Sequence, residues 1–524
     1  MEIQAARVGA FLVLLGARLT GGESAPALIA GPYLTGLGPD RVTVSWETNR
    51  PMPGRVEYYV DPANEQSADA GPAARLHHVT LTGLPPATVC AYRVHFGEEH
   101  SPFYRFTTAP GAPAAFRFAA YGDSRTYPKR HLAVAQAIEA HRPAFVVHTG
   151  DLVTDGMSAK QWPKEFFEPA RELLGGSPIV PTMGTHERNA PAYFRYFRSL
   201  SAEPWLAWVS GEAPAFWRSA PAWLTWTYGE AEFFVINSYA SVEPDSPQRR
   251  WLAEALAASR ARWKIALFHE PLYSSGRHGG SEKLRQALLP LFFQHGLDLV
   301  LVGHDHTYER TVAIGSGPRP SENALVEVVT GGGGASLHKI LPGPWTARAA
   351  RTLNFSILSV GSDELTGVTY DETHRPVDWF VLSKRDGRRN FGEAIAAESL
   401  EFLLAARRFG GFVFTTGWGQ PPRQPFAFNV RNPYASELHG ELTWDIHNKA
   451  WTIDPPTQTV RIPSGGKAEV AFTVTLAPTP EAPAAEPVPM AILTSGGHSV
   501  SVPGFALQKV APPKAKPRAK APVP

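Results

Sequence analysis

Aspartate and histidine side chains recur at the ends of short apolar runs in the middle of this 524-residue chain. Five such runs are followed by two aspartates and four histidines, most of them beside a glycine: Asp123, Asp151, His186, His269, His304 and His306. Because ligands bind where the carboxyl ends of strands converge in an open α/β sheet, we expect these side chains to lie close together. Carboxylate and imidazole together favour Mn²⁺, Zn²⁺ or iron over Ca²⁺.

Several other chemistries are excluded by what the sequence lacks. The single cysteine, Cys90, rules out an intrachain disulfide, a Cys₄ zinc site and an iron–sulfur cluster. No Gly-x-x-x-x-Gly-Lys-Ser/Thr segment occurs, and the glycine run 331–334 is not followed by lysine. A P-loop nucleotide-binding site is therefore excluded.

The charge balance gives no support to nucleic-acid binding. The chain has 50 basic and 48 acidic residues, a formal charge of +2. Residues 509–524 carry five basic residues and no acid, so the remainder sums to −3 (2 − 5). Nucleic-acid binders carry a basic excess, which the folded part of this chain lacks.

The N-terminus has the pattern of an export signal. Arg7 precedes an apolar stretch, 8–17, that is too short to span a bilayer as a helix, and Ala25-Pro-Ala27 offers a small-residue cleavage site. We therefore expect a signal peptide at residues 1–27 and a secreted or periplasmic protein. No later segment is long and apolar enough to predict a transmembrane helix.

Strand and helix patterns divide the rest of the chain. Residues 29–110 contain short alternating strands separated by turns, which is typical of a β-sandwich. Residues 114–385 alternate apolar runs with helical patterns and predict an α/β core whose sheet is buried on both faces. Alternation returns at 426–507 and predicts a second, Ig-like β-sandwich. Residues 508–524 are rich in Pro, Ala and Lys and predict a disordered tail.

The order of the motifs resembles that of the calcineurin-like metallophosphoesterase superfamily, and within it bacterial relatives of the purple acid phosphatases. That set is Gly-Asp, Gly-Asp, Gly-Asn-His-Glu, a lone His and Gly-His-x-His, and its counterparts here lie between Asp123 and Arg310. Residues 29–110 resemble the fibronectin-III-like domain that precedes the catalytic domain in purple acid phosphatases. The resemblance implies a metallophosphoesterase core, a β-sheet sandwich flanked by helices, at residues 114–385.

The resemblance also implies a role for each site residue. Two divalent or trivalent ions of Fe, Mn or Zn would be held by Asp123 and His306 (first ion), by His269 and His304 (second ion) and by Asp151 (both). His186 would be the general acid, with Glu187 behind it. The implied activity is hydrolysis of small phosphoric esters, above all monoesters, by in-line attack of a metal-bound hydroxide on phosphorus.

Three residues depart from the family pattern. Arg125 stands where the superfamily often has a histidine, and we expect it to bind a phosphate oxygen of the substrate. Thr154 stands where the purple enzymes have a metal-binding tyrosine, so no purple colour is expected. Thr185 replaces the asparagine ligand of the third motif. Its shorter, neutral hydroxyl predicts a second metal site that binds more weakly.

Two alternatives stay open on the sequence alone. A phosphodiesterase or nucleotidase could use the same site, because the sequence does not fix the shape of the pocket. The protein could also be a catalytically weakened relative that binds a partner through its sandwiches, with a cell-surface or glycan contact at the C-terminal one. Thr185 is the main support for this second alternative.

Overall fold

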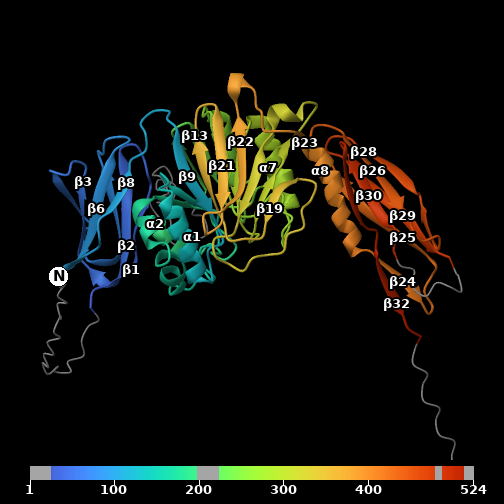
Figure 1. The fold of residues 1–524 in the computed structure, drawn as a ribbon, viewed down its shortest axis with the longest axis horizontal. Helices are drawn as coiled ribbons and strands as arrows, with labels where there is room; N and C mark the ends of the chain where they lie inside the picture. Colours follow the sequence, from blue (N-terminus) through green and yellow to red (C-terminus); the bar gives the residue numbers. More distant parts are fainter. Residues whose placement is uncertain (1–24, 198–222, 478–486, 513–524) are drawn as a thin grey trace, which may run out of the picture.

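An α/β core lies between two β-rich regions in the computed structural model, which describes residues 25–197, 223–477 and 487–512 (Figure 1). This arrangement confirms the predicted fold class. The predicted signal peptide lies outside the described residues up to residue 24, and the predicted tail does so from residue 513 on. In the part of the chain that the structure describes, no helix is long and apolar enough to cross a membrane.

The N-terminal region consists of two sheets that enclose an apolar core. Its first sheet has the order β1-β2-β5, with β1 (Leu28–Thr35), β2 (Arg41–Met52) and β5 (Ala74–Thr82). Its second sheet comprises β4 (Glu65–Asp69), β3 (Gly54–Tyr59), β6 (Val89–Phe96), β7 (Glu99–His100) and β8 (Tyr104–Thr107). Alternate residues point inward, as the period-two pattern predicted, and they bury Trp46 completely.

Two larger sheets form the core region. The first has the order β11 (Ile179–Pro181), β10 (Val146–His148), β9 (Phe116–Tyr121), β20 (Phe355–Val360), β21 (Glu364–Tyr370) and β22 (Pro376–Ser383). The second has the order β12 (Leu224–Tyr228), β13 (Ala231–Val235), β14 (Trp263–Leu267), β15 (Leu299–Val302), β18 (Val326–Thr330), β16 (Tyr308–Thr311) and β19 (Thr346–Ala350). Two short strands, β17 (Ala313–Gly315) and β23 (Ala394–Ala396), pair with each other beside this sheet.

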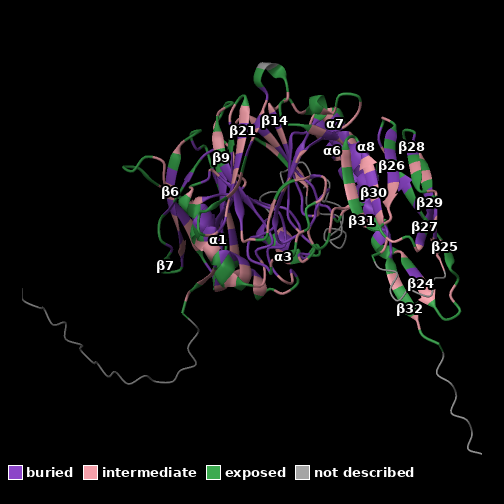
Figure 2. Ribbon diagram, turned by 45° about the vertical axis from the view of Figure 1, so that its right-hand side comes forward, coloured by how far each residue is buried: buried purple, intermediate pink, exposed green. Residues whose placement is uncertain are grey.

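The two sheets pack face to face, and helices cover their outer faces. Phe118 on β9 meets Phe233 on β13 edge to face, with 5.3 Å between the ring centroids. The neighbouring residue on β13, Phe234, points the other way and joins the cluster under the helices. Both faces of these strands are therefore buried, as their continuous apolar runs predicted (Figure 2).

The described helices of the core region differ in how their ends are capped. They are α1 (Pro128–Ala140), η1 (Trp162–Phe167), α2 (Arg171–Gly176), α3 (Pro191–Tyr196), α6 (Pro247–Ala258) and α7 (Glu282–His295), with short turns η4 (Pro320–Asn323) and η5 (Arg385–Gly387). The Ser281 hydroxyl accepts the Leu284 N–H at the start of α7, and Gly296, with φ 65°, ends it. Both ends were predicted from the sequence.

The C-terminal region is a sandwich joined to the core by α8 (Ala397–Leu404) and η6 (Ala405–Gly411). Its first sheet has the order β25 (Arg423–Arg431), β29 (Lys467–Leu476), β27 (Trp451–Asp454). Its second sheet has the order β28 (Thr457–Ile462), β26 (Leu438–Asp445), β30 (Met490–Ser495), β31 (His498–Pro503). A separate pair joins β24 (Val413–Gly417) to β32 (Ala506–Val510).

The predicted boundaries of this region need correction. The strands begin at residue 413 rather than 426, and β32 runs to Val510, past the predicted start of the tail at 508. Backbone pairing with β24 holds the end of β32 in place, so the basic composition that begins at Lys509 did not mark the end of the fold.

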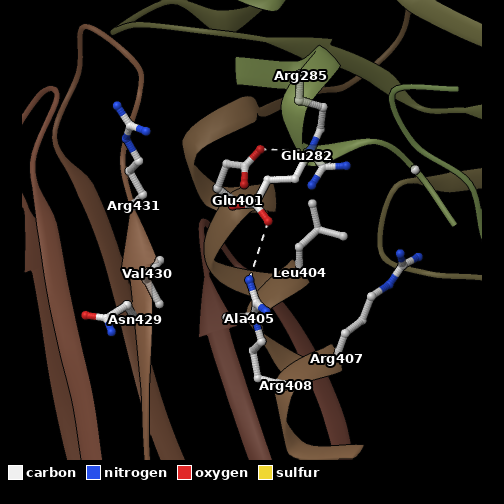
Figure 3. Close-up of a pocket in the computed structure, with 11 residues that line it drawn as sticks. Glu282, Arg285, Glu401, Leu404, Ala405, Arg407, Arg408, Asn429, Val430 and Arg431 are labelled. Carbon is white, nitrogen blue, oxygen red and sulfur yellow. Dashed lines mark hydrogen bonds and ion pairs between the residues drawn. The ribbon is translucent and has the colours of Figure 1, made fainter. Parts of the chain in front are cut away.

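A pocket of about 250 Å³ lies where α7, α8 and β25 meet (Figure 3). A buried ion pair forms one wall, with the Arg285 Nε atom 2.9 Å from a Glu401 carboxylate oxygen. Arg285 also donates to the Leu272 carbonyl, and the Tyr434 hydroxyl of the sandwich donates to Glu401. This polar cluster connects the core, α8 and the sandwich.

Candidate metal centre

The predicted site residues all lie in loops that follow the carboxyl ends of strands. β9, β10 and β11 run parallel in one sheet, and β14 and β15 run parallel in the other. The residues that follow them are Asp123, Asp151 and His186 in the first sheet and His269, His304 and His306 in the second. Because the two sheets pack face to face, these loops meet at one edge, as the sequence predicted.

Three of these residues hold the backbone in the left-handed region. Asp123 has φ 57°, Asp151 φ 58° and His304 φ 70°. Non-glycine residues adopt this conformation at a cost, and such residues cluster at functional sites. Here the conformation turns each side chain inward directly after its strand.

Asp151 lies at the centre of the site. Its Oδ1 atom accepts the backbone N–H of His186 at 2.9 Å and lies 3.5 Å from His269 Nε2. Its Oδ2 atom accepts an N–H from Arg125 at 3.3 Å and lies 3.7 Å from His186 Nε2. The carboxylate therefore faces His269 through one oxygen and the Arg125 and His186 side chains through the other.

Asp123 is fully buried and has an unsatisfied oxygen. Its Oδ2 atom accepts the His304 N–H at 2.9 Å, whereas Oδ1 has no hydrogen-bond partner and lies 3.5 Å from His306 Nε2. Burial, together with the nearby Asp151 carboxylate, raises the pKa of Asp123 well above its usual range. A bound cation would satisfy Oδ1 and favour the charged form of Asp123.

The histidines are held in the form that can bind a metal. Nδ1 of His269 donates to the Thr149 carbonyl and Nδ1 of His306 donates to the Ser336 carbonyl, each at 2.7 Å. Each Nε2 lone pair therefore faces the carboxylates. Burial lowers the pKa of His306 to about 3 and also lowers that of His269, so both rings are neutral near pH 7.

The predicted acid and its neighbour lie on the next loop. His186 Nδ1 lies 2.6 Å from the Thr154 carbonyl and donates to it, and the ring is partly exposed. Glu187 is completely buried and accepts four backbone N–H groups, those of Asp151, Leu152, Val153 and Gly184. Glu187 thus fixes the two loops that carry Asp151 and His186.

Thr185 contacts a residue that the sequence analysis missed. Its hydroxyl lies 2.5 Å from that of Tyr239, whose ring centroid is 6.0 Å from that of His269. Tyr239 follows β13, whose polar end, Asn237-Ser-Tyr239, was left out of the motif set. The position after a buried strand was the signal that could have identified it.

The other two departures from the family pattern make contacts of their own. The Thr154 hydroxyl bonds to Thr126 and Glu165. Arg125 directs Nε to Asp151, Nη1 to Thr126 at 3.2 Å and Nη2 to His306 at 3.4 Å. The guanidinium therefore lies among the candidate ligands.

A second polar cluster adjoins the first. Asp305, between the two histidines of the last motif, is fully buried and accepts N–H bonds from the His278 backbone and His338 Nδ1 and a bond from Ser274. The His338 ring stacks on that of His306, with 4.0 Å between centroids. These residues fix the His304–His306 loop, a role that their sequence pattern did not predict.

Three of the predicted ligands, drawn from both predicted ion positions, form one compact group. Among the described residues, Asp123, Asp151 and His269 each offer one ligand atom, and all three atoms lie within 4.8 Å of one another. The unsatisfied Asp123 oxygen and the neutral, buried imidazole fit a divalent or trivalent cation.

Several known proteins have sequences similar to the part of this chain that carries the site. The family model described as calcineurin-like phosphoesterase matches residues 116–308. An uncharacterized protein of Mycobacterium tuberculosis is 28% identical over 324 residues, which cover 52% of this chain and 60% of that protein. Purple acid phosphatase 18 of Arabidopsis thaliana is 26% identical over 323 residues, 58% of this chain and 70% of the plant protein. The chain thus spans about three fifths of the mycobacterial relative.

A solved structure shows the same fold. The purple acid phosphatase from seeds of yellow lupin (Lupinus luteus) matches with a TM-score of 0.56 at 20% sequence identity, over 68% of this chain and 74% of that chain.

Proposed function

Because the calcineurin-like phosphoesterase family model matches residues 116–308, we propose that this chain is an exported, metal-dependent hydrolase of phosphoric esters that prefers monoesters. The observation that carries the proposal is the meeting of Asp123, Asp151 and His269 at one buried point, with a carboxylate oxygen left unsatisfied. Purple acid phosphatases among the similar proteins support the preference for monoesters.

The family implies a dinuclear metal centre, for which Fe, Mn or Zn suits the carboxylate and imidazole ligands. Bound metal supplies positive charge for the phosphoryl oxygens and a nucleophile that is active near neutral pH. The chain's own residues hold that charge in place. Thr149 and Ser336 fix the tautomers of His269 and His306, and Glu187 fixes the Asp151 loop.

His186 donates a proton to the leaving group. Water attacks phosphorus in line with the leaving oxygen, the ester P–O bond breaks, and the leaving oxygen takes a proton from His186 Nε2. The Thr154 carbonyl accepts the Nδ1–H and so aims Nε2 at the site. The nearby Asp151 carboxylate oxygen, 3.7 Å from Nε2, stabilises the protonated ring.

Replacing His186 with alanine should lower kcat for an alkyl phosphate by about 10²–10⁴-fold, because the leaving alkoxide then lacks a proton donor. The loss should be much smaller for p-nitrophenyl phosphate, whose leaving group needs no proton. Steady-state kinetics with both substrates measures the difference. His439→Ala, at an exposed histidine of the sandwich, is the matched control. Equal losses with both substrates would contradict the assigned proton-donor role.

Replacing Glu187 with glutamine should weaken metal binding by about 10–100-fold, because an amide NH₂ would face backbone N–H groups that now have an acceptor. Competition with a chelator of known affinity measures this change. The exposed Glu168→Gln variant keeps the same chemistry away from the site and should bind metal like the unaltered chain. Unchanged metal affinity in Glu187→Gln would show that the loop does not depend on this carboxylate.

The proposed preference for monoesters is tested by comparing two substrates. The purified, metal-loaded protein should hydrolyse p-nitrophenyl phosphate faster than bis(p-nitrophenyl) phosphate. A faster rate on the diester would favour a phosphodiesterase. Hydrolysis of neither substrate would remove the proposed function and favour a binding protein.

We also propose that the protein is exported and secreted or periplasmic, on the strength of the N-terminal pattern alone. Mass spectrometry of the protein recovered outside the cytoplasm should give a chain that begins after Ala27. An intact residue 1 in that fraction would contradict the cleavage.

A further inference from the structure

Arg125 takes up two ligand atoms that the family resemblance assigned to metal binding. Its Nε–H donates to Asp151 Oδ2 at 3.3 Å, and its Nη2–H donates to the Nε2 atom of His306 at 3.4 Å. His306 Nδ1 donates to the Ser336 carbonyl, so Nε2 is the acceptor atom of a neutral ring. The lone pair expected to bind the first ion therefore receives a guanidinium N–H.

The residue that could complete the first ion position is also engaged elsewhere. Thr154, at the position of the family's tyrosine ligand, directs its hydroxyl to Thr126 and to the Glu165 carboxylate, which it meets at 2.8 Å. Because His306 is bonded to Arg125 and Thr154 is bonded to Glu165, Asp123 is the one predicted ligand specific to the first ion position that remains available.

The remaining ligand atoms converge on one point. Asp123 Oδ1 is unsatisfied, Asp151 Oδ1 lies 3.5 Å from His269 Nε2, and these three residues form one group within 4.8 Å. His304 Nδ1 lies 3.2 Å from the same His269 nitrogen and donates to it, because His269 Nδ1 already donates to the Thr149 carbonyl. An imidazole can move its proton to its other nitrogen and so free both rings for a cation, whereas the Arg125 guanidinium keeps its N–H groups. This arrangement offers two carboxylates and two imidazoles to a single ion.

We propose that this chain binds one catalytic metal ion, held by Asp123, Asp151, His269 and His304, and that the Arg125 guanidinium is a fixed cation in place of the other. An arginine stays protonated at all working pH values and matches carboxylate geometry through its planar N–H groups. It therefore neutralises Asp151 permanently, and its charge opposes a second cation beside it. The proposal deepens the proposed function, but its test counts metal and does not depend on hydrolysis.

The test is the metal content of the full chain after loading with Mn²⁺ and removal of free ion. Elemental analysis should find about one Mn²⁺ per chain, with the six-line electron paramagnetic resonance spectrum of an isolated ion. Arg125→His supplies an imidazole in place of the cation and should raise the content to about two, with a spin-coupled spectrum. Arg130→His, at an exposed arginine on α1, is the matched control and should stay at about one.

Arg125→Ala provides a second variant should Arg125→His not fold, because it frees Asp151 and His306 without adding a side chain; it too should bind more than one ion per chain. The proposal is overturned by two ions or a spin-coupled spectrum in the unaltered chain, by less than one ion in it, or by contents in both Arg125 variants that match the control. A chain that binds one ion but hydrolyses no ester would support the one-ion proposal and contradict the proposed hydrolase function.

Discussion

Replacing Asp151 with asparagine should lower the hydrolysis of p-nitrophenyl phosphate by about 10³-fold or more, equivalent to at least about 4 kcal/mol of transition-state stabilisation. Asp151 presents one oxygen to His269 and the other to Arg125 and His186, so its negative charge contacts a predicted metal ligand, the guanidinium and the predicted proton donor. The asparagine side chain is neutral and offers one oxygen instead of two. We therefore expect metal to be lost together with activity.

The matched control is Asp245→Asn, at an exposed position just before α6. It should keep full activity and metal content. Initial rates at saturating metal, read beside metal content, separate the two effects. An Asp151→Asn variant that keeps more than a tenth of the rate would contradict the central role of this carboxylate.

Replacing Arg285 with alanine should lower the free energy of unfolding by about 3–5 kcal/mol, because it leaves the Glu401 charge buried without its partner. Figure 3 shows this ion pair, both of whose side chains are about 5% exposed. Arg285 also bonds the Leu272 carbonyl in the loop leading to His278. The loss of stability should therefore be greatest at the junction between the core and the C-terminal sandwich.

Arg408→Ala is the control within the same pocket. Its ion pair with Glu282 is 3.4 Å long and more than half exposed on the arginine side, so its removal should cost less than about 1 kcal/mol. Urea unfolding followed by circular dichroism and tryptophan fluorescence measures both variants. Equal stabilities of the two variants would mean that the buried pair contributes no more than the exposed one.

The strands that carry the site were predictable because their sequences are continuous apolar runs. β9, β10, β14, β15 and β18 are mostly buried on both faces, and each is followed within two residues by a glycine or a polar residue. α7 was equally clear, since Ser281 and Gly296 mark its two ends chemically. β20 and β21 were missed because their residues mix polar and apolar types, as in Ser356, Ser359 and Thr369.

The residue types of the site were predictable, but the partners of its side chains were not. Motif order brought Asp123, Asp151 and His269 together as expected. Contacts between loops distant in sequence decided the rest, such as Thr185 with Tyr239, 54 positions away, and Arg125 with His306, 181 positions away. The prediction that Arg125 binds a phosphate oxygen remains a prediction, because its guanidinium here bonds to protein groups.

The segment before the C-terminal sandwich shows a different limit. Residues 386–424 had no recognisable pattern, yet they include α8, whose residues are all buried, and η6, which buries only Ala405, Ala406 and Phe409. The polar residues of α8, Glu398, Ser399 and Glu401, are buried like the apolar ones, so the helix lacks the solvent-facing polar side on which an amphipathic pattern depends. α8 is buried because it lies between the core and the sandwich, which becomes evident only when both have folded.

The rate of p-nitrophenyl phosphate hydrolysis, measured as metal is returned to the stripped protein, tests the proposed metal-dependent hydrolase most sharply. We expect negligible turnover after chelation and a rate that rises with bound Mn²⁺, Zn²⁺ or iron until the site is filled. Activity that survives complete removal of metal, or a fully loaded protein with no activity on any phosphate ester, would contradict this function.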